Sequence, residues 1–256
     1  MTTRERIVDG SLVDQHTIAR SLALHLLPGI ATATLFFALA PVVIGAGYPA
    51  IAAGVLAAAV AVVAAELGWL LREAHRRTGR WSLTSVLPYR PGPFTWRKAL
   101  LVLGLLAWGL LGAPMLVGDL KPLLIETVFA RVPGWAINPL PADIADTATG
   151  TAMVLTAVGY ALILVVLGPL VEELYFRGYL LPRLARFAGW APLLNVSLFA
   201  VYHLWKPWDV VTVATVLLPT VYAVWWTRDI RIGIAVHVGL NGLGFLLNVA
   251  PTLLAG

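Results

Sequence analysis

The sequence contains no cysteine. Disulfide bonds, Cys-ligated zinc and thiol catalysis are therefore excluded for this chain. It also has little charge: Asp, Glu, Lys and Arg make up 12% of its 256 residues and hydrophobic residues 59%, and the mean hydropathy is +0.84. A soluble domain has about 25% charged residues, because its surface faces water. Most of this surface must face lipid instead, so the chain is predicted to be an integral membrane protein.

Long uncharged runs predict membrane-spanning helices, because a helix needs about 20 apolar residues to cross the hydrocarbon core. We expect seven spans, at about 21–46, 49–71, 99–118, 148–171, 190–205, 208–227 and 231–255. An eighth is expected if residues 178–189 also lie in or along the membrane. The predicted fold class is all-α, a multi-pass transmembrane helical bundle of seven to eight spans.

Positive charges concentrate in loops that the spans place on one side. The segment 72–98 holds seven Lys and Arg residues and one acidic residue, Glu73. Because Lys and Arg prefer cytoplasmic loops, we predict that this loop and the N-terminus are cytoplasmic, in a cell (plasma) membrane. The net-negative loop 119–147 then lies outside. This distribution accounts for the net charge of +5, and no nucleic-acid partner is expected.

The 119–147 loop also suggests a division of the chain. We predict an N-terminal part, 1–147, made of transmembrane helices and the basic loop, and a C-terminal part, 148–256, within one integral membrane domain. Ionisable residues inside apolar runs are costly and usually face a protein interior or a cavity. In the N-terminal part only His25 and Glu66 qualify. Each stands alone near the end of a span, so we interpret them as interfacial side chains.

The C-terminal part has a denser polar motif. The fourth span runs into Glu172-Glu173-Leu-Tyr-Phe-Arg177-Gly178. On a helix, Glu173 and Arg177 are four residues apart and can form an ion pair. Glu172 is turned about 100° away from Glu173, so it is left without a partner and can take a proton. Burial favours this role, because a desolvated carboxyl group binds a proton more readily and can therefore act as a general base near neutral pH.

Two further motifs lie on later spans. Phe199 and His203 are four residues apart, and so are His237 and Asn241, so each pair shares one helical face. A single buried histidine is more often a hydrogen-bonded structural residue than a catalytic one. A carboxylate, two imidazoles and an amide on three successive spans, however, are the components of a site that activates water.

These motifs resemble those of the CPBP family of intramembrane proteases, which includes the type II CaaX prenyl endopeptidases and the bacteriocin-processing (Abi) enzymes. The residues that carry the resemblance lie within about 168–245: Glu172, Glu173, Arg177, Phe199, His203, His237 and Asn241. The resemblance implies a CPBP-like protease core within 148–256 and hydrolysis of a peptide bond inside the membrane. The substrate would be a membrane-associated peptide or protein, such as a prenylated CaaX peptide or a leader peptide.

The resemblance also implies roles for the residues. Glu172 with His203 would activate the water, His237 and Asn241 would stabilise the oxyanion, and Glu173, Arg177 and Phe199 would shape the site. The family has been described both as metalloproteases and as metal-independent glutamate proteases. If zinc were present, Glu172, His203 and His237 would be its ligands. An Asn in the fourth place suits an oxyanion better than a metal, so catalysis without a cofactor is favoured.

Other protease chemistries find little support. The chain has no His-Glu-x-x-His of a zinc protease and no Gly-x-Ser-x-Gly nucleophile elbow. Two non-protease alternatives stay open. One is a proton-coupled transporter that uses the same buried Glu and His residues, which predicts internal repeats, and none is evident. The other is a non-catalytic membrane immunity or scaffold protein, which the sequence cannot distinguish from an enzyme.

Overall fold

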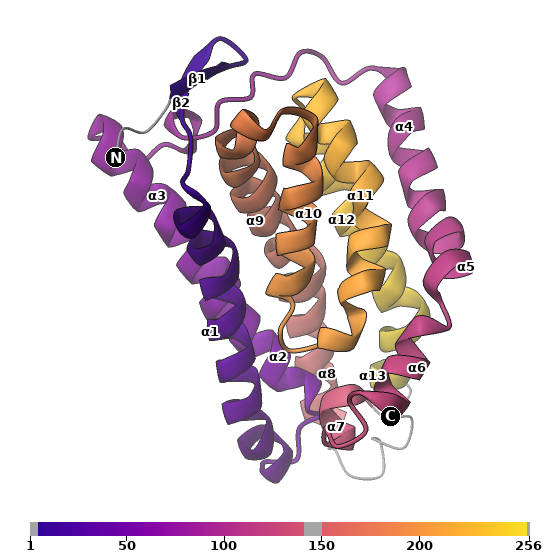
Figure 1. The fold of residues 1–256 in the computed structure, drawn as a ribbon. Coiled ribbons are helices and arrows are strands. Elements are labelled where there is room, and N and C mark those ends of the chain that lie inside the picture. Colours follow the sequence, from indigo (N-terminus) through magenta and orange to yellow (C-terminus); the bar gives the residue numbers. More distant parts are fainter. Residues whose placement is uncertain (1–4, 141–149, 255–256) are drawn as a thin grey trace.

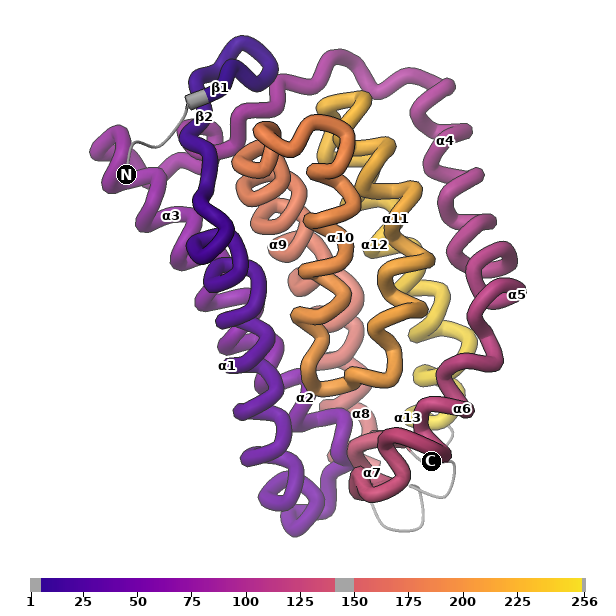
Figure 2. The backbone as a smooth tube through the Cα atoms, in the orientation of Figure 1, coloured from indigo at the N-terminus to yellow at the C-terminus, as the bar shows by residue number. Residues whose placement is uncertain are grey.

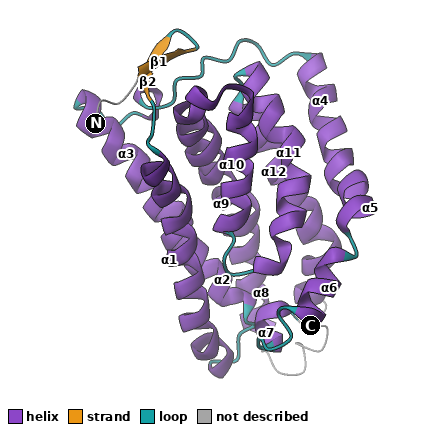
Figure 3. Ribbon diagram, in the orientation of Figure 1, coloured by secondary structure: helices purple, strands orange, loops and turns teal. Residues whose placement is uncertain are grey.

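The computed structural model describes residues 5–140 and 150–254, and most of them are helical (Figures 1 and 3). Six continuous helical segments are long and apolar enough to cross a membrane: Ile18–Gly45, Ile51–Thr78, Trp96–Val117, Gly150–Tyr202, Pro207–Thr227 and Ile230–Leu254. The fold class, a transmembrane helical bundle, is thereby confirmed. The count of seven to eight spans is not.

The N-terminal part contains three of the six segments. The first is α1 (Ile18–Gly45), and the second is built from α2 (Ile51–Ala58), the π-helical η1 (Ala59–Ala64) and α3 (Ala65–Thr78). After the 3-10 turn η2 (Leu83–Ser85), the third segment consists of α4 (Trp96–Ala107), the π-helical η3 (Trp108–Gly112) and α5 (Ala113–Val117). The predicted 119–147 loop contains two short helices, α6 (Leu120–Thr127) and α7 (Gly134–Ile137).

The C-terminal part begins with one long helical segment. It comprises α8 (Gly150–Gly159), η5 (Tyr160–Leu167), α9 (Gly168–Glu172), η6 (Glu173–Leu180), η7 (Leu181–Trp190) and α10 (Ala191–Tyr202), of which η5 and η6 are π-helical. The 3-10 turn η8 (Pro207–Asp209), α11 (Val210–Thr227) and α12 (Ile230–Gly244) follow. The chain ends with the π-helical η9 (Phe245–Val249) and α13 (Ala250–Leu254). The predicted boundary at 147/148 lies outside the described residues.

The fifth expected span, 190–205, and the possible eighth, 178–189, form a folded-back arm of the fourth helical segment. At Ala188 the backbone leaves the helical region (φ 49°, ψ −129°), and α10 returns along η6 and η7 (Figure 1). With 12 residues, α10 is about 18 Å long at 1.5 Å per residue, too short to cross the hydrocarbon core. Residues 178–184 are buried in protein. Tertiary packing, which the apolar runs do not reveal, therefore explains the differing span count.

A small β-hairpin was not expected from the sequence. Strands β1 (Glu5–Val8) and β2 (Ser11–Asp14) pair antiparallel. The turn between them is Asp9-Gly10, and both residues have positive φ, 49° and 75°. Asp-Gly is a favoured two-residue hairpin turn because Gly adopts positive φ without strain. This signal was available in the sequence, although it was masked by the polar character of the segment.

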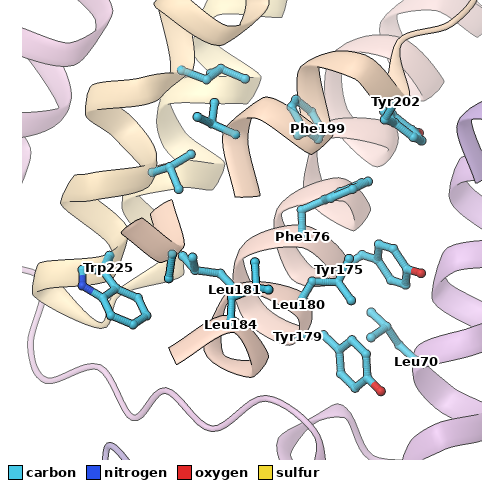
Figure 4. Packing of buried hydrophobic residues seen from close by; sticks show 14 of the residues in the cluster. Leu70, Tyr175, Phe176, Tyr179, Leu180, Leu181, Leu184, Phe199, Tyr202 and Trp225 are labelled. Carbon is cyan, nitrogen blue, oxygen red and sulfur yellow. The ribbon is translucent and has the colours of Figure 1, made fainter. Parts of the chain in front are cut away.

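The surface and the core confirm that lipid is the solvent of this fold. Large apolar side chains on the outer faces of the helices are strongly exposed, among them Leu111, Met115, Leu155, Leu246 and Leu247. In water, so wide an apolar surface would drive association. The main core lies between η6, η7, α10, α11 and α3, where aromatic and leucine side chains interlock (Figure 4).

The two ends of the bundle differ in their elements. The hairpin, the end of α3, the start of α4 and the α11–α12 turn lie at one end, which we call the basic end. The helices α6, α7 and α13 lie at the other (Figures 1 and 2). At the basic end, Lys98 Nζ lies 2.7 Å from Asp229 Oδ2, and Arg231 Nε lies 2.8 Å from Asp229 Oδ1. These ion pairs connect the start of α4 to the start of α12.

Candidate active site

The Glu-Glu motif lies where the long fourth segment changes its helical geometry. Pro169 lacks a backbone N–H and starts the short α9, and π-helical turns lie on both sides of it, in η5 and η6. The helix therefore continues through Pro169 by widening its turns. π-helical turns are rare in proteins overall, but those that occur are often found at functional sites. Glu172 and Glu173 stand at the junction of α9 and η6, in the interior of the bundle.

The predicted ion pair within the motif is present. Arg177 Nη1 lies 3.3 Å from Glu173 Oε1, and both side chains are buried. The guanidinium also lies over the Phe199 ring, with its central carbon 4.0 Å from the ring centroid. Ionic and cation–π attraction both strengthen when the groups are shielded from water. Phe199, on α10, therefore helps to fix the Arg177 side chain, which in turn forms the ion pair with Glu173.

His237 bridges the two glutamates. Its Nδ1 lies 3.1 Å from Glu173 Oε1, and its Nε2 lies 3.7 Å from Glu172 Oε2. A carboxylate can only accept, so Nδ1–H donates to Glu173, which sets the orientation of the ring. The sequence predicts Glu172 without a partner, and the structure places His237 beside it because α12 packs against α9 and η6.

This close packing depends on a small residue on α12. A Cβ atom added to Gly233 would collide with Oε2 of Glu173. Glycine at this position therefore allows the backbone of α12 to approach the buried carboxylate. The sequence already shows several glycines around the His-x-x-x-Asn motif, and the structure places Gly233 against the carboxylate of Glu173.

His203 approaches from the opposite wall. It is the first residue after α10 (φ −74°, ψ 49°), and its Nδ1 lies 2.9 Å from the carbonyl oxygen of Phe199. Since a carbonyl only accepts, Nδ1–H is the donor and Nε2 is left free to accept a proton. The Phe199 and His203 rings are in edge contact, with centroids 4.8 Å apart, as their shared helical face predicts.

One cavity unites these groups. It has a volume of about 610 Å³, and Glu172, Phe199, His203, His237 and Asn241 are among its lining residues. The four predicted catalytic residues therefore face one space, although they come from three segments. Glu173 and Arg177 are not among its lining residues. The Asn241 amide donates to the carbonyl oxygen of Leu164 at 2.9 Å, which leaves its second N–H available.

The N-terminal part also contributes buried polar residues, and the interfacial interpretation of His25 and Glu66 is wrong. His25 is fully buried, and its Nδ1 lies 2.7 Å from the Ser21 carbonyl oxygen and its Nε2 3.2 Å from Asn195 Nδ2. Asn195 also donates to the Phe176 carbonyl oxygen at 3.0 Å. His25 thus connects α1 to the arm that carries the site. A position near a span end did not reveal that the helix is covered on this face.

Glu66, at the start of α3, is the least expected member of this interior. It is 1% exposed, and its carboxyl oxygens have no hydrogen-bond partner of regular geometry among the described residues, with only the Tyr202 hydroxyl close enough to interact as a donor. Its electrostatic neighbours are Glu172, Arg177 and the hydroxyl of Tyr202. The Tyr202 ring packs against the ring of Phe199, with centroids 5.6 Å apart, and both are labelled in Figure 4. The cavity region therefore holds a third buried glutamate.

We predict that Glu66→Leu raises the thermal stability of the protein. A buried polar group without a hydrogen bond costs about 1–3 kcal/mol, and leucine removes that cost at similar volume. The matched control is Glu73→Leu on the same helix, because Glu73 accepts hydrogen bonds from Arg76 and Arg77 at 3.0 and 2.7 Å. Thermal unfolding in detergent should show a higher midpoint for Glu66→Leu and a lower one for Glu73→Leu. A larger loss for Glu66→Leu than for the control would show that Glu66 makes a favourable interaction.

The side chains that line the cavity include the types of ligand that zinc accepts, but they do not lie close enough together to form a zinc site. Two imidazole Nε2 atoms and one carboxylate match the ligands that zinc accepts. Among the described residues, however, no group of three or more His, Asp or Glu side chains is close enough together to hold a metal ion. Glu172, His203 and His237 therefore do not form a ligand set as placed, and no step below uses a metal.

The chain matches a protein-family model. Residues 154–243 match the family described as Type II CAAX prenyl endopeptidase Rce1-like. No curated protein and no solved structure matches the chain significantly. The matched segment begins within α8 and ends within α12, so it includes all three motifs and leaves out the first three spans. The resemblance that the motifs predicted is thereby confirmed: residues 154–243 of this integral membrane protein match the Rce1-like CAAX protease family, which implies a peptidase.

Proposed function

We propose that the protein is an intramembrane endopeptidase that hydrolyses a peptide bond of a membrane-associated substrate with a water molecule activated by Glu172 and His203. One observation carries the proposal. Glu172, His203, His237 and Asn241 line one cavity in an apolar bundle, within a segment that matches a peptidase family. Such residues are costly in lipid and persist where they serve a function.

The proposed reaction needs no cofactor. Glu172 removes a proton from water, the hydroxide attacks the carbonyl carbon of the peptide bond, and the C–N bond then breaks. The amine leaves with the proton that Glu172 took, so the carboxylate is restored. The free Nε2 of His203 accepts from the same water and orients it. The second N–H of Asn241 donates to the negative charge that develops on the carbonyl oxygen. His237 also donates to it, through Nε2–H, when its ring carries both protons and Nδ1–H stays on Glu173.

Glu173 and Arg177 act through His237. The hydrogen bond from Nδ1 of His237 to Glu173 (3.1 Å) fixes the ring, and Arg177 (3.3 Å) holds the carboxylate. A carboxylate that orients an imidazole is a recurrent arrangement in hydrolytic sites. These two residues are therefore positioning residues, and the cavity wall between them and the substrate is formed by His237 and Phe199.

The substrate can be found by comparing three strains that differ only at this protein: wild type, a deletion, and Glu172→Gln. We expect at least one membrane-associated peptide whose terminus changes in the same way in the deletion and in the Glu172→Gln strain. Terminal proteomics of the membrane fraction is the measurement. If only the deletion changes the peptide pattern, the protein acts without hydrolysis, as a scaffold or immunity protein would.

Cofactor dependence is tested on the purified protein. Metal-free catalysis predicts substoichiometric zinc by elemental analysis and full activity after chelation. A stoichiometric zinc ion whose removal stops turnover would require the side chains of Glu172, His203 and His237 to move together, and it would replace the reaction proposed here.

A further inference from the structure

The two ends of the bundle carry very different charge. Of the 18 Lys and Arg residues in the sequence, only three fall on the segments at the α6–α7 end: Lys121, Arg131 and Lys206. Nearly all the others in the described residues belong to the hairpin, the 72–98 segment, η7 and the α11–α12 turn. By the preference of Lys and Arg for cytoplasmic loops, the basic end is the cytoplasmic end.

The cavity extends from the site toward the α6–α7 end of the bundle. Its lining extends from Glu172 and His237 to Ile137 and Pro139 beside α7 and to Lys121, Lys206 and Asp209, and it includes no residue of the basic end. The side chains of Lys121 and Lys206 are 44% and 37% exposed. Lys121 Nζ lies 3.1 Å from Asp209 Oδ1, and Lys206 Nζ lies 4.0 Å from Asp209 Oδ2. These three residues form the polar rim of the mouth.

Between the site and the basic end the bundle is closed. A layer of buried side chains fills this region (Figure 4), and it includes Phe176, Tyr179, Leu180, Leu181 and Leu184, each at most 2% exposed. Arg183, also buried, donates to the carbonyl oxygen of Tyr179 at 2.7 Å and to that of Val86 at 3.3 Å. These bonds fasten the basic 72–98 segment over the end of the helix. Water and peptide therefore reach Glu172 from the mouth.

The inner walls of the cavity indicate what enters. Apolar side chains of α1, α2 and η1 form one wall and those of α11 another, among them Phe36, Ile51, Val62, Val213 and Leu217. Trp205 and Trp208 also line the cavity near the rim, and Trp and Lys are typical of the membrane–water interface. A charged, hydrated loop would lose its solvation here, whereas an apolar segment would not.

From these observations we infer that the site is loaded from the extracytoplasmic face, and that its substrate is an apolar peptide segment anchored in the outer leaflet. The inference rests on the proposed function only in that it treats the bound segment as a substrate. The direction of access and the apolar occupant depend only on the cavity and on the charge of the two ends. Cleavage would then release a product outside the cell or into the outer leaflet.

The absence of native cysteine makes the direction of access measurable. Single-cysteine variants are Lys206→Cys and Lys121→Cys at the rim, Thr212→Cys in the cavity lining and Arg76→Cys at the basic end, where the side chain is 66% exposed. Right-side-out spheroplasts are treated with a membrane-impermeant, charged methanethiosulfonate, before and after permeabilisation. We expect both rim variants and Thr212→Cys to react in intact spheroplasts, and Arg76→Cys only after permeabilisation. Reaction of Arg76→Cys alone in intact spheroplasts, or of all variants, overturns the inference.

The occupant is tested by protection. A synthetic apolar peptide with an N-terminal acyl chain is added before the reagent. We expect it to slow the labelling of Thr212→Cys and to leave that of Arg76→Cys unchanged. Equal labelling rates with and without the peptide would overturn the apolar occupant. Both readouts are independent of turnover, so they remain decisive even if the protein cleaves no peptide, in which case only the proposed function fails.

Discussion

Glu172→Gln should abolish peptide hydrolysis while the protein still inserts and folds. Glutamine has nearly the same shape, so the packing of α9 against α12 is kept, but it cannot take a proton from water. General-base catalysis contributes roughly 10²–10⁴-fold, and a loss of at least this size is expected in kcat/KM. His203→Ala should act in the same direction, because Nε2 of His203 is the second acceptor in the cavity. The measurement is the cleavage rate of the peptide identified by terminal proteomics, on purified protein in detergent or nanodiscs.

A matched control separates the chemistry from the loss of a buried carboxyl group. Glu66→Gln changes a second buried glutamate next to Glu172, and in the proposed reaction Glu66 takes no step. It should keep activity within a few fold of wild type. Wild-type rates for Glu172→Gln would show that another group is the base, and the presence of Glu66 in the same interior makes it the first residue to examine in that event.

Arg177→Ala should cause the largest loss of stability of any single substitution proposed here. Removing one partner of a buried ion pair leaves an uncompensated charge, which costs about 3–5 kcal/mol. The contact of the guanidinium with Phe199 (4.0 Å) is lost as well. The free carboxylate of Glu173 then no longer holds His237 in place, so activity should fall along with the thermal midpoint. Differential scanning measurements in detergent and the peptide assay provide the two readouts.

The control for this prediction is an arginine in an exposed pair. Arg76 Nη2 lies 2.9 Å from Glu73 Oε2, and its side chain is 66% exposed. Exposed ion pairs contribute about 0–1 kcal/mol, so Arg76→Ala should shift the midpoint little and leave activity unchanged. Arg177→Lys is the second variant in case the alanine variant does not fold, because it keeps the charge but not the planar contact with Phe199. An unchanged midpoint and unchanged activity for both Arg177 variants would remove this pair from the account of the site.

The motif residues could be identified from the sequence for a specific physical reason. In a chain with only 12% charged residues, an ionisable residue inside an apolar run is conspicuous. Helical spacing then determines which of these residues share a face, and the pair Glu173–Arg177 and the contact of Phe199 with His203 follow from spacing alone. These are contacts within one helix, so they need no knowledge of the tertiary fold.

Contacts between helices could not be predicted in the same way. His237 is paired with both glutamates because α12 packs on α9 and η6, and Glu66 and His25 are buried because α3 and α1 cover the other side of the arm. No local pattern encodes these neighbours. The same limit affects the count of spans: the run at 190–205 is apolar like a span, but α10 has 12 residues and packs against η7 and α11 as part of the fourth segment.

The sequence by itself determined the solvent, the helical class and the residues of the candidate site, because composition and helical periodicity are local properties. Only the tertiary structure decided which histidine lies beside Glu172, that a third glutamate is buried nearby, and that the cavity opens at the end opposite the basic loops. Those three facts depend on how separate helices pack, and packing in lipid is directed by shape and by a few small residues such as Gly233. Low charge identified lipid as the surroundings of this chain, and the fold determined which of its buried glutamates lines a cavity.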